Sequence, residues 1–217
     1  MHNMKLESDG ILISITPFNE RDAIAHIFTY KHGVLTGMLR GANIVKQNKP
    51  LAGQIGHTTW NARLDSQLGV FHWEYEKNLV VSLMQNPTTL SYINSAFSLI
   101  QALLPERESY PKLYEATVIL LQNINQSPTE RYLDWEIKLL QELGYALDLS
   151  HCSGCNTYES LEYLSPRTGR AVCTKCAAPY IPKLYKLPLN LGITLRFLDN
   201  ICTQQGTQIP LMRKILK

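Results

Sequence analysis

Gly56-His-Thr-Thr-Trp-Asn-Ala-Arg-Leu64 and Gly69-Val-Phe-His-Trp-Glu-Tyr-Glu76 are two segments in which side chains of different character alternate. In the first segment, Trp60 lies on the more apolar face, and in the second, three aromatic residues share one face. A period of two is the period of a strand that buries one of its sides. The two segments therefore predict two strands of a sheet, with Trp60 in the core.

Three more strands are predicted on the N-terminal side of these two. They are expected at Ile11–Ile15, Ala25–Tyr30 and Val34–Arg40. The second and third are separated by Lys31-His32-Gly33, in which the glycine suits a turn position with positive φ. Five strands within about 70 residues, without a long helical pattern, indicate a small barrel of the OB-fold type, which binds oligonucleotides. We expect this fold for residues 1–80.

A basic window extends from residue 23 to residue 64, where the sequence contains no Asp or Glu. The cations within it are Lys31, Arg40, Lys46, Lys49 and Arg63. Cations gathered on one face are the electrostatic footprint of a site for a polyanion. The alternative is a solvated basic face whose acidic complement lies elsewhere in space.

Helical periodicity replaces the strand pattern after Pro87. Helices are expected at Thr88–Leu104, Pro111–Asn125, Thr129–Leu143 and about Asn190–Gln204. In the third helix, Ser127 is expected to cap the N-terminus, Glu130 to complete a capping box and Gly144 to end the helix. The acidic residues of this helix, including Glu136, are interpreted as solvated because no Glu-x-x-His motif accompanies them. Residues 81–217 are therefore expected to form an α-helical domain.

Two Cys-x-x-Cys pairs, Cys152-Ser-Gly-Cys155 and Cys173-Thr-Lys-Cys176, stand seventeen residues apart. Each pair can present both sulfurs to one tetrahedral centre, and thiolates suit the borderline-soft Zn²⁺ ion. We predict one structural Zn²⁺ per chain, in a module at about residues 150–180, because four protein ligands leave no open position for catalysis. Disulfides, a redox role and His151 as a substitute ligand are the alternatives. Cys202 lies outside the pattern and is expected to be a small buried residue.

The net charge of +3 is distributed unevenly along the chain. It divides into +1 for residues 1–80, −4 for residues 81–150 and +6 for residues 151–217. The last segment includes Arg167, Arg170, Lys175, Lys183 and Lys186. Two interpretations of these side chains stand: the cysteine module contacts phosphate through them, or they are only solvated.

Motifs of catalysis and of membrane insertion are missing from the sequence. There is no G-x-S-x-G and no H-E-x-x-H, so we expect a non-catalytic protein without a small-molecule substrate. No stretch reaches the roughly 18 apolar residues of a membrane span, and no contact with a membrane is expected. The N-terminal segment, acidic at Glu7 and Asp9, differs from a secretory signal, which favours a cytoplasmic location.

The order of these parts resembles the RecO family of bacterial recombination mediators. The segments that carry the resemblance are Asp9–Ile13, Pro17–Asp22, Phe28–Gly33, Leu39–Ala42, Trp135–Glu136 with Glu142–Ser150, and Tyr163–Val172. They cover nearly the whole chain. The resemblance implies an α+β multidomain protein: an OB-fold followed by an α-helical domain with an inserted zinc module of four cysteine ligands.

An activity is also implied by the resemblance: a mediator of DNA repair and homologous recombination in the RecF pathway. Such a protein binds single- and double-stranded DNA, anneals complementary strands and, with RecR, helps RecA to replace single-strand binding protein. A nucleoid-associated location follows from this role. The cations of the basic window are then expected to bind DNA phosphate, with Tyr30 as a candidate for base stacking.

Two details of the resemblance concern individual residues. The family's basic cluster maps onto Lys46 and Lys49, whereas Asn43 stands where an Arg is expected. The acidic, Phe-ended C-terminal tail of single-strand binding protein needs an apolar pocket rimmed by cations. The candidate cations in the helical domain are Lys112, Arg131 and Lys138.

Two other functions remain open on the sequence. One is a zinc-ribbon OB-fold protein that binds RNA in transcription or translation, which a preference for structured RNA would reveal. The other is an unrecognised enzyme of nucleic-acid metabolism, which metal-dependent nuclease or ligase turnover would reveal.

Overall fold

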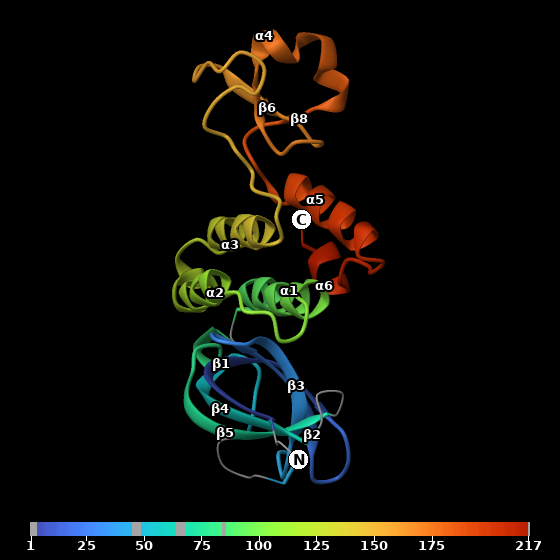
Figure 1. Ribbon diagram of the computed structural model, residues 1–217. Coiled ribbons are helices and arrows are strands. Elements are labelled where there is room, and N and C mark those ends of the chain that lie inside the picture. The colour runs from blue at the N-terminus through green and yellow to red at the C-terminus, as the bar shows by residue number, and fades with distance from the viewer. Residues whose placement is uncertain (1–3, 45–48, 64–67, 84–85, 217) are drawn as a thin grey trace.

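The computed structural model describes residues 4–44, 49–63, 68–83 and 86–216. Three parts follow one another along the molecule: a β-barrel, a layer of helices, and a small module of short strands and helices (Figure 1). The N-terminus lies at the barrel end. The chain returns from the small module to the helical layer, where the C-terminus lies.

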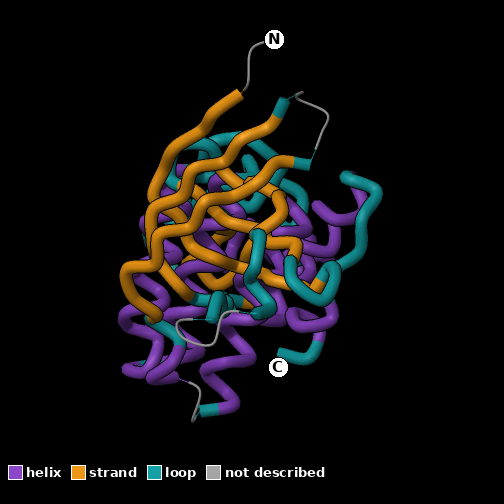
Figure 2. Tube along the Cα trace, turned by 90° about the horizontal axis from the view of Figure 1, so that it is seen from below, coloured by secondary structure: helices purple, strands orange, loops and turns teal. Residues whose placement is uncertain are grey.

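The barrel is closed and contains five strands in the order β1-β2-β3-β5-β4. The strands are β1 (Met4–Pro17), β2 (Ala23–Thr29), β3 (Gly33–Leu39), β4 (Gln54–Ala62) and β5 (Gly69–Asn78). β1 is long enough to pair with two neighbours, β4 through its first half and β2 through its second, and its register shifts between Leu12 and Ser14. A short parallel pairing of β3 with β5 completes the closure. Seen from the barrel end, the strands cover the helices (Figure 2). The predicted five-stranded OB-like fold is confirmed.

The barrel interior is built around Trp60, which is 1% exposed. The Trp60 indole Nε1 donates a hydrogen bond to the Thr36 carbonyl at 3.0 Å. A Cβ at Gly69 would lie 2.0 Å from the same ring, so only glycine allows the start of β5 to approach it. The prediction that Trp60 belongs to the core is confirmed, and its ring is not available for base stacking.

The helical layer contains three long helices, a fourth that returns from the module, and a short last helix. They are α1 (Pro87–Leu103), α2 (Pro111–Asn123), α3 (Pro128–Glu142), α5 (Leu191–Gln204) and α6 (Leu211–Lys214), with 3₁₀ turns at Val81–Leu83 and Ile124–Gln126. The side chains of Asn86 and Asn190 cap α1 and α5. Ser127 occupies the N-cap position of α3 but makes no side-chain capping bond, so the predicted capping box does not form. Gly144, at φ +88°, follows the end of α3 as expected.

Among the described residues, no helix is long and apolar enough to cross a membrane.

Glu136 on α3 corrects a prediction, because its side chain is fully buried rather than solvated. The Arg213 guanidinium, also fully buried, donates to both carboxylate oxygens, through Nε to Oε1 and through Nη2 to Oε2 at 3.0 Å. Hydroxyl groups of Tyr132 and Thr194 donate to the same carboxylate. Arg213 Nη2 also donates to the Leu191 carbonyl at 2.6 Å. This network ties α6 to α3 and α5.

The barrel and the helical layer are joined at the loop between α1 and α2. The Arg107 N–H donates to the Val34 carbonyl at 3.0 Å, and Val34 forms an isolated β-bridge with Glu106. The Arg107 guanidinium lies 4.8 Å from the centre of the Trp60 ring. Gly33, at φ +63° as the turn predicted, faces the same loop, and a Cβ there would lie 1.8 Å from the Glu108 carbonyl oxygen.

Gly33→Ala is expected to destabilise the joint by roughly 2–5 kcal/mol. This sum combines about 1–2 kcal/mol for a left-handed alanine with about 1–3 kcal/mol for overpacking against Glu108. Gly206→Ala is the matched control, because Gly206 has φ +69° but an added methyl there would meet no atom within 4 Å, and it should cost only the first part. Urea denaturation of both variants measures the difference. Equal losses would show that Gly33 needs only its backbone conformation.

The small module, residues 151–186, is called the cysteine module. It contains β6 (Leu161–Leu164), β7 (Ala171–Cys173), α4 (Thr174–Ala177), the 3₁₀ helix Ala178–Lys183 and β8 (Tyr185–Lys186). Its strands form a sheet in the order β7-β6-β8. Its own buried apolar cluster is small, namely Cys152, Val172, Cys173 and Ala177. Because two of these four residues are cysteines of the Cys-x-x-Cys pairs, the module has little apolar core apart from them.

Candidate metal centre and nucleic-acid interface

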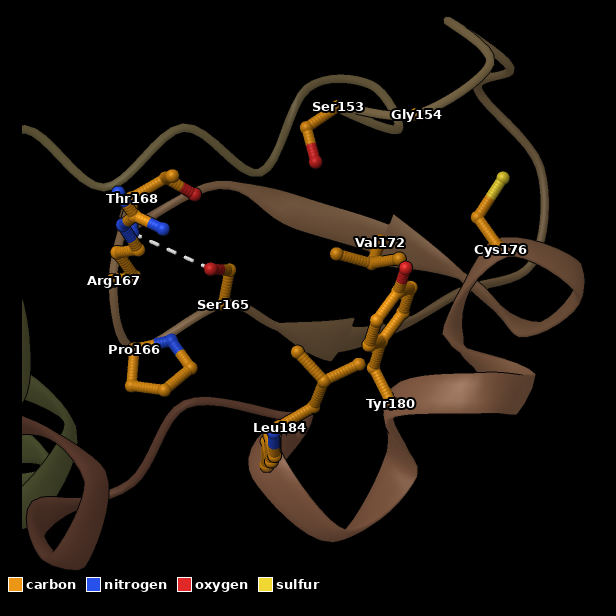
Figure 3. A pocket seen from close by; sticks show the side chains of 11 residues that line it. Ser153, Gly154, Ser165, Pro166, Arg167, Thr168, Val172, Cys176, Tyr180 and Leu184 are labelled. Carbon is orange, nitrogen blue, oxygen red and sulfur yellow. Dashed lines mark hydrogen bonds between the residues drawn. The ribbon is translucent and has the colours of Figure 1, made fainter.

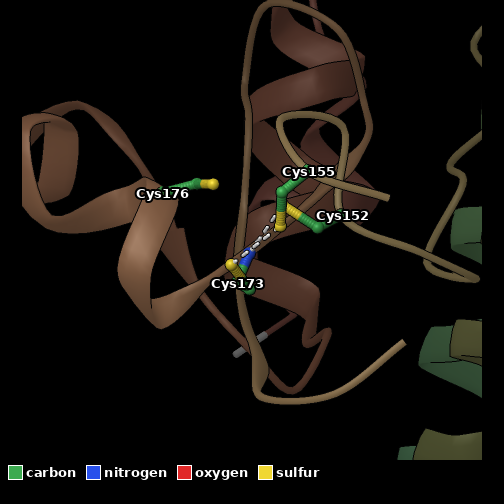
Figure 4. Close-up of side chains that lie close together, drawn as sticks. All are labelled: Cys152, Cys155, Cys173 and Cys176. Carbon is green, nitrogen blue, oxygen red and sulfur yellow. Dashed lines mark hydrogen bonds between the residues drawn. The ribbon is translucent and has the colours of Figure 1, made fainter. Parts of the chain in front are cut away.

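The four cysteines of the two Cys-x-x-Cys pairs meet in the cysteine module (Figure 4). Their sulfur atoms all lie within 4.8 Å of one another, and the Sγ atoms of Cys155 and Cys173 are 3.6 Å apart. Zn–S bonds of about 2.3 Å in a tetrahedron would place the sulfurs about 3.8 Å apart. The cysteines are free thiols and not disulfides. The predicted cluster of Cys152, Cys155, Cys173 and Cys176 is therefore confirmed as a group that fits a metal ion.

The backbone around the cluster prepares one sulfur for ionisation. Burial acts to raise the pKa of the Cys152 thiol, but hydrogen bonds from backbone N–H groups outweigh it and lower the pKa to about 6. Two of these donors are the amides of Cys173 at 3.2 Å and Gly154 at 3.4 Å. Such N–H groups stabilise a thiolate, which is the form that binds a metal.

The crowding of the thiols has the opposite effect on the last cysteine. Hydrogen bonding with the thiols of Cys155 and Cys173, followed by burial, raises the pKa of Cys176 to about 12. Four thiolates this close repel one another, and a divalent cation at their centre removes the repulsion. The donor set is thus suited to a soft divalent ion.

Local sequence explains how the first cysteine pair can turn so tightly. A Cβ at Gly154 would lie 3.0 Å from the Cys176 sulfur, so glycine gives the two pairs room to approach. His151 points its ring nitrogens at Ser150 Oγ and at the Arg170 guanidinium, at 2.8 Å and 3.0 Å. Both ring nitrogens of His151 therefore have hydrogen-bond partners, and His151 does not belong to the cysteine cluster. Cys202, 1% exposed on α5, is buried as predicted.

The cations of the basic window do not share one short groove. Lys31 lies in the turn before β3 and Arg40 directly after β3. A strand of this length separates its two ends by about 20 Å. Lys31 also lies near acidic side chains, because it contributes, after Lys5 and His57, to a lowered pKa of Glu7. Tyr30 contacts the Tyr114 ring of α2 edge-on at 5.6 Å, which turns it toward the helices.

The remaining described cations of the window, Lys49 and Arg63, lie beyond opposite ends of β4. Arg63 follows the end of β4, where Ala62 pairs with Met4. Lys49 precedes β4, and its carbonyl accepts a hydrogen bond from the Gln54 side chain at 3.1 Å. Lys46 lies outside the described residues.

Asn43 has a structural role in the loop after β3. Its amide Nδ2 donates to the carbonyls of Asn19 at 2.7 Å and Asp22 at 2.8 Å. The Asp22 carboxylate in turn accepts a bond from the Gly41 N–H at 2.9 Å, and this bond is the main cause of its lowered pKa. The loop that carries Arg40 is thereby fastened to the turn between β1 and β2.

This fastened turn contains two candidate contact residues that sequence reasoning missed. Phe18 is 63% exposed, and Arg21 is exposed beside it. The loop between the first two strands is one of the OB-fold elements that bind oligonucleotides. Glu20 and Asp22 flank Arg21 and placed it outside the acid-free window. The signal available in the sequence was an aromatic residue in the segment between two predicted strands.

A separate pocket lies between α2 and α3. It has a volume of about 210 Å³ and is lined by Ala116, Ile119, Leu120, Arg131, Asp134, Trp135 and Lys138. Two of the predicted cations, Arg131 and Lys138, thus meet at one apolar pocket. The third, Lys112, is exposed one helical turn before Ala116. The sequence grouped these cations by domain, and the packing of two helices brings two of them together.

Comparison with known proteins agrees with this arrangement of parts. The family model "Recombination protein O N terminal" matches residues 1–72, and "Recombination protein O C terminal" matches residues 84–213. The chain is 36% identical over 189 residues to the DNA repair protein RecO of Rhodospirillum centenum, covering 85% of this chain and 76% of that protein. It is 35% identical over 184 residues to the DNA repair protein RecO of Dinoroseobacter shibae, covering 83% and 76% of the two chains.

Proposed function

Because the chain belongs to the RecO family of DNA repair proteins, we propose that it is a non-catalytic mediator of homologous recombination. In this role it binds single- and double-stranded DNA, anneals complementary strands and, with RecR, helps RecA to replace single-strand binding protein. The observation that carries the proposal is the match of both family models, in order, over most of the chain. A closed OB-like barrel, the architecture that binds single strands in other proteins, supports it.

We place the DNA-binding surface on the side of the barrel that carries the β1–β2 turn and the loop after β3. Arg21 and Arg40 supply positive charge there, and Phe18 supplies an exposed ring for base stacking. The end of β4 lies across β5 from the end of β3, so Arg63 is assigned to the same side. Lys46 and Lys49, which come next in sequence, are proposed as further phosphate contacts. Lys31, beside Glu7, contributes least.

Replacing Lys46 and Lys49 with Ala is expected to weaken binding of single-stranded DNA about equally for all sequences. Each phosphate contact releases counterions, so losing two should flatten the log–log dependence of affinity on salt by roughly 1–1.5. Phe18→Leu should instead lower affinity about fivefold or more and leave this slope unchanged, because stacking contributes about 1–3 kcal/mol per base. Fluorescence anisotropy of a labelled oligonucleotide at several salt concentrations measures both quantities.

Lys5→Ala serves as the control, because Lys5 is already paired with Glu7 on the barrel. It removes one positive charge from the barrel, half of what the test variant removes. Unchanged affinity and slope in the Lys46 and Lys49 variant would remove the basic window from the DNA-binding surface.

The pocket between α2 and α3 is proposed to bind the acidic, Phe-ended tail of single-strand binding protein. Its apolar walls suit the terminal aromatic ring, and Arg131 and Lys138 suit carboxylates. Lys138 donates to Gln141 Oε1 at 3.2 Å and is exposed, so its charge is available at the rim. Lys112 does not line the pocket.

Replacing Arg131 and Lys138 with Ala should weaken tail-peptide binding about 5–30-fold, because rim charges contribute up to about 1 kcal/mol each. Replacing Lys175 and Lys186 with Ala removes the same charge from the cysteine module and should leave binding unchanged. Calorimetric titration of the peptide into the full chain compares the two. Equal weakening would indicate nonspecific attraction and exclude the pocket.

The metal of the cysteine cluster is proposed to be a structural Zn²⁺ ion. All four ligand positions are filled by Cys152, Cys155, Cys173 and Cys176, which supports a structural role over a catalytic one. When bound, the ion supplies cross-links between the two halves of the module. We propose that the protein acts in the cytoplasm, associated with the nucleoid.

A further inference from the structure

A concave site on the cysteine module has no role in the functions proposed above. It has a volume of about 740 Å³, in the range of small-molecule sites. Its lining residues are Ser153, Gly154, Ser165, Pro166, Arg167, Thr168, Val172, Cys176, Tyr180, Lys183 and Leu184. The first cysteine turn lies on one side of it, and the 3₁₀ helix with Tyr180 lies on the other (Figure 3). We refer to it as the module pocket.

The walls of the module pocket suit a flat aromatic ligand. Tyr180 is 58% exposed although it lines the pocket, so much of its ring is free to contact a ligand. Val172, Leu184 and Pro166 add apolar surface around it. A nucleobase can stack on such a ring whatever its sequence. An exposed tyrosine beside apolar side chains is the kind of platform on which single strands are held.

The charges of the module pocket suit a phosphate. Its lining includes two cations, Arg167 and Lys183, and no carboxylate among the described residues. Arg167 lies at the end opposite Cys176 (Figure 3). Because thiolates around a divalent ion carry net negative charge, a phosphate is favoured at the Arg167 end and disfavoured at the Cys176 end. The pocket thus has an end that suits an anion, near Arg167, and an apolar middle around Tyr180.

We propose that the module pocket binds one nucleotide of single-stranded DNA, with the base on Tyr180 and the phosphate at Arg167 and Lys183. The proposal rests on the DNA-binding function proposed above and adds a second contact to it. The helical layer separates the cysteine module from the barrel (Figure 1), so the pocket and the barrel hold different parts of a strand, or two strands. The acidic, Phe-ended tail is already assigned to the pocket between α2 and α3, so DNA is the occupant proposed for the module pocket.

Tyr180→Leu in the full chain tests the stacking contact with a labelled oligothymidine probe. Losing one stacked base should weaken binding about fivefold or more without changing the salt slope. Tyr158→Leu is the matched control, because Tyr158 is 79% exposed on the same module and does not line the pocket. Metal content and thermal unfolding of each variant confirm that the module is folded.

The phosphate contact is tested with two double variants of equal charge. Arg167→Ala with Lys183→Ala should flatten the salt slope by about 0.7, which corresponds to the one phosphate that both side chains contact. Lys175→Ala with Lys186→Ala removes the same charge from residues that do not line the pocket and should change the slope less. Photo-crosslinking of an oligonucleotide that contains 5-iododeoxyuridine should label the tryptic segment 176–183, which contains Tyr180.

Each outcome supports or overturns the assignment. Equal affinity of the Tyr180 and Tyr158 variants, with crosslinks only in the barrel, overturns it and leaves DNA binding in place. Absence of oligonucleotide binding by the unsubstituted chain at low salt refutes the proposed function and this site with it. Weakened binding of an acidic tail peptide by Tyr180→Leu, with oligonucleotide binding unchanged, identifies a peptide as the occupant and overturns the assignment to DNA.

Discussion

Cys152→Ser is expected to remove the metal from the protein and to unfold the cysteine module. A structural zinc site contributes about 10–16 kcal/mol in zinc-finger peptides, and a variant that no longer holds the ion loses this contribution. The module has little apolar core to compensate, since Cys152 and Cys173 are themselves half of its buried cluster. Cys152 also accepts the backbone hydrogen bonds that hold the two cysteine pairs together.

Metal analysis and limited proteolysis measure this effect. The unsubstituted chain should contain about one zinc per molecule, and Cys152→Ser should lose it and become sensitive to protease between residues 151 and 186. Cys202→Ala is the matched control, because Cys202 is an equally buried thiol outside the cluster, and this variant should keep its metal. Reduced, folded protein without metal would refute the zinc assignment.

Arg213→Ala is expected to destabilise the helical layer by about 3–5 kcal/mol. The substitution leaves the fully buried Glu136 carboxylate without its cation, and an uncompensated buried charge is strongly unfavourable. It also removes the hydrogen bond to the Leu191 carbonyl that holds α6 against the start of α5. Denaturant unfolding should therefore show a large shift of the midpoint.

Two further variants separate the charge from the packing. Lys214→Ala alters the exposed neighbour and should change stability by no more than about 0.5 kcal/mol. Glu136→Leu combined with Arg213→Met replaces the ion pair with apolar groups and should recover much of the loss, because such replacements are often neutral. A loss below about 1 kcal/mol in Arg213→Ala would contradict the account of a buried ion pair that holds α6 in place.

The sequence predicted those parts of the fold that depend on patterns within a few consecutive residues. Alternation in β4 and β5 predicted strands at Gly56–Leu64 and Gly69–Glu76, and the strands occur at Gln54–Ala62 and Gly69–Asn78. The spacing of the cysteines predicted their convergence, because each pair fixes two sulfurs within three residues of chain. Local geometry decides both features, so distant residues hardly alter them.

The errors concern contacts between residues that are distant in sequence. Glu136 was interpreted as solvated because no Glu-x-x-His motif accompanies it, and its partner Arg213 lies 77 residues later. Lys31 and Arg40 lie within one acid-free window but at opposite ends of β3. Ser127 had the residue type of a cap but not its hydrogen bond. For Glu136 and for the two cations, the tertiary structure determined the outcome, and composition alone does not encode it.

The candidate sites also divide into those set by local sequence and those set by contacts between distant residues. The metal ligands were predictable residue by residue, whereas the pocket of Arg131 and Lys138 depends on the packing of α2 against α3. The module pocket combines segments from 153 to 184 that no single motif joins. Phe18 was overlooked because it lies in a turn, outside every periodic segment.

Strand annealing in the presence of single-strand binding protein tests the proposed mediator function most directly. Two complementary oligonucleotides, each coated with single-strand binding protein, are mixed with the full chain, and duplex formation is followed by fluorescence energy transfer between labels on the two strands. We predict faster duplex formation with added protein, slowing as salt rises, with both strands intact at the end. No acceleration at any ratio of protein to DNA, or cleavage of the strands, would contradict the account.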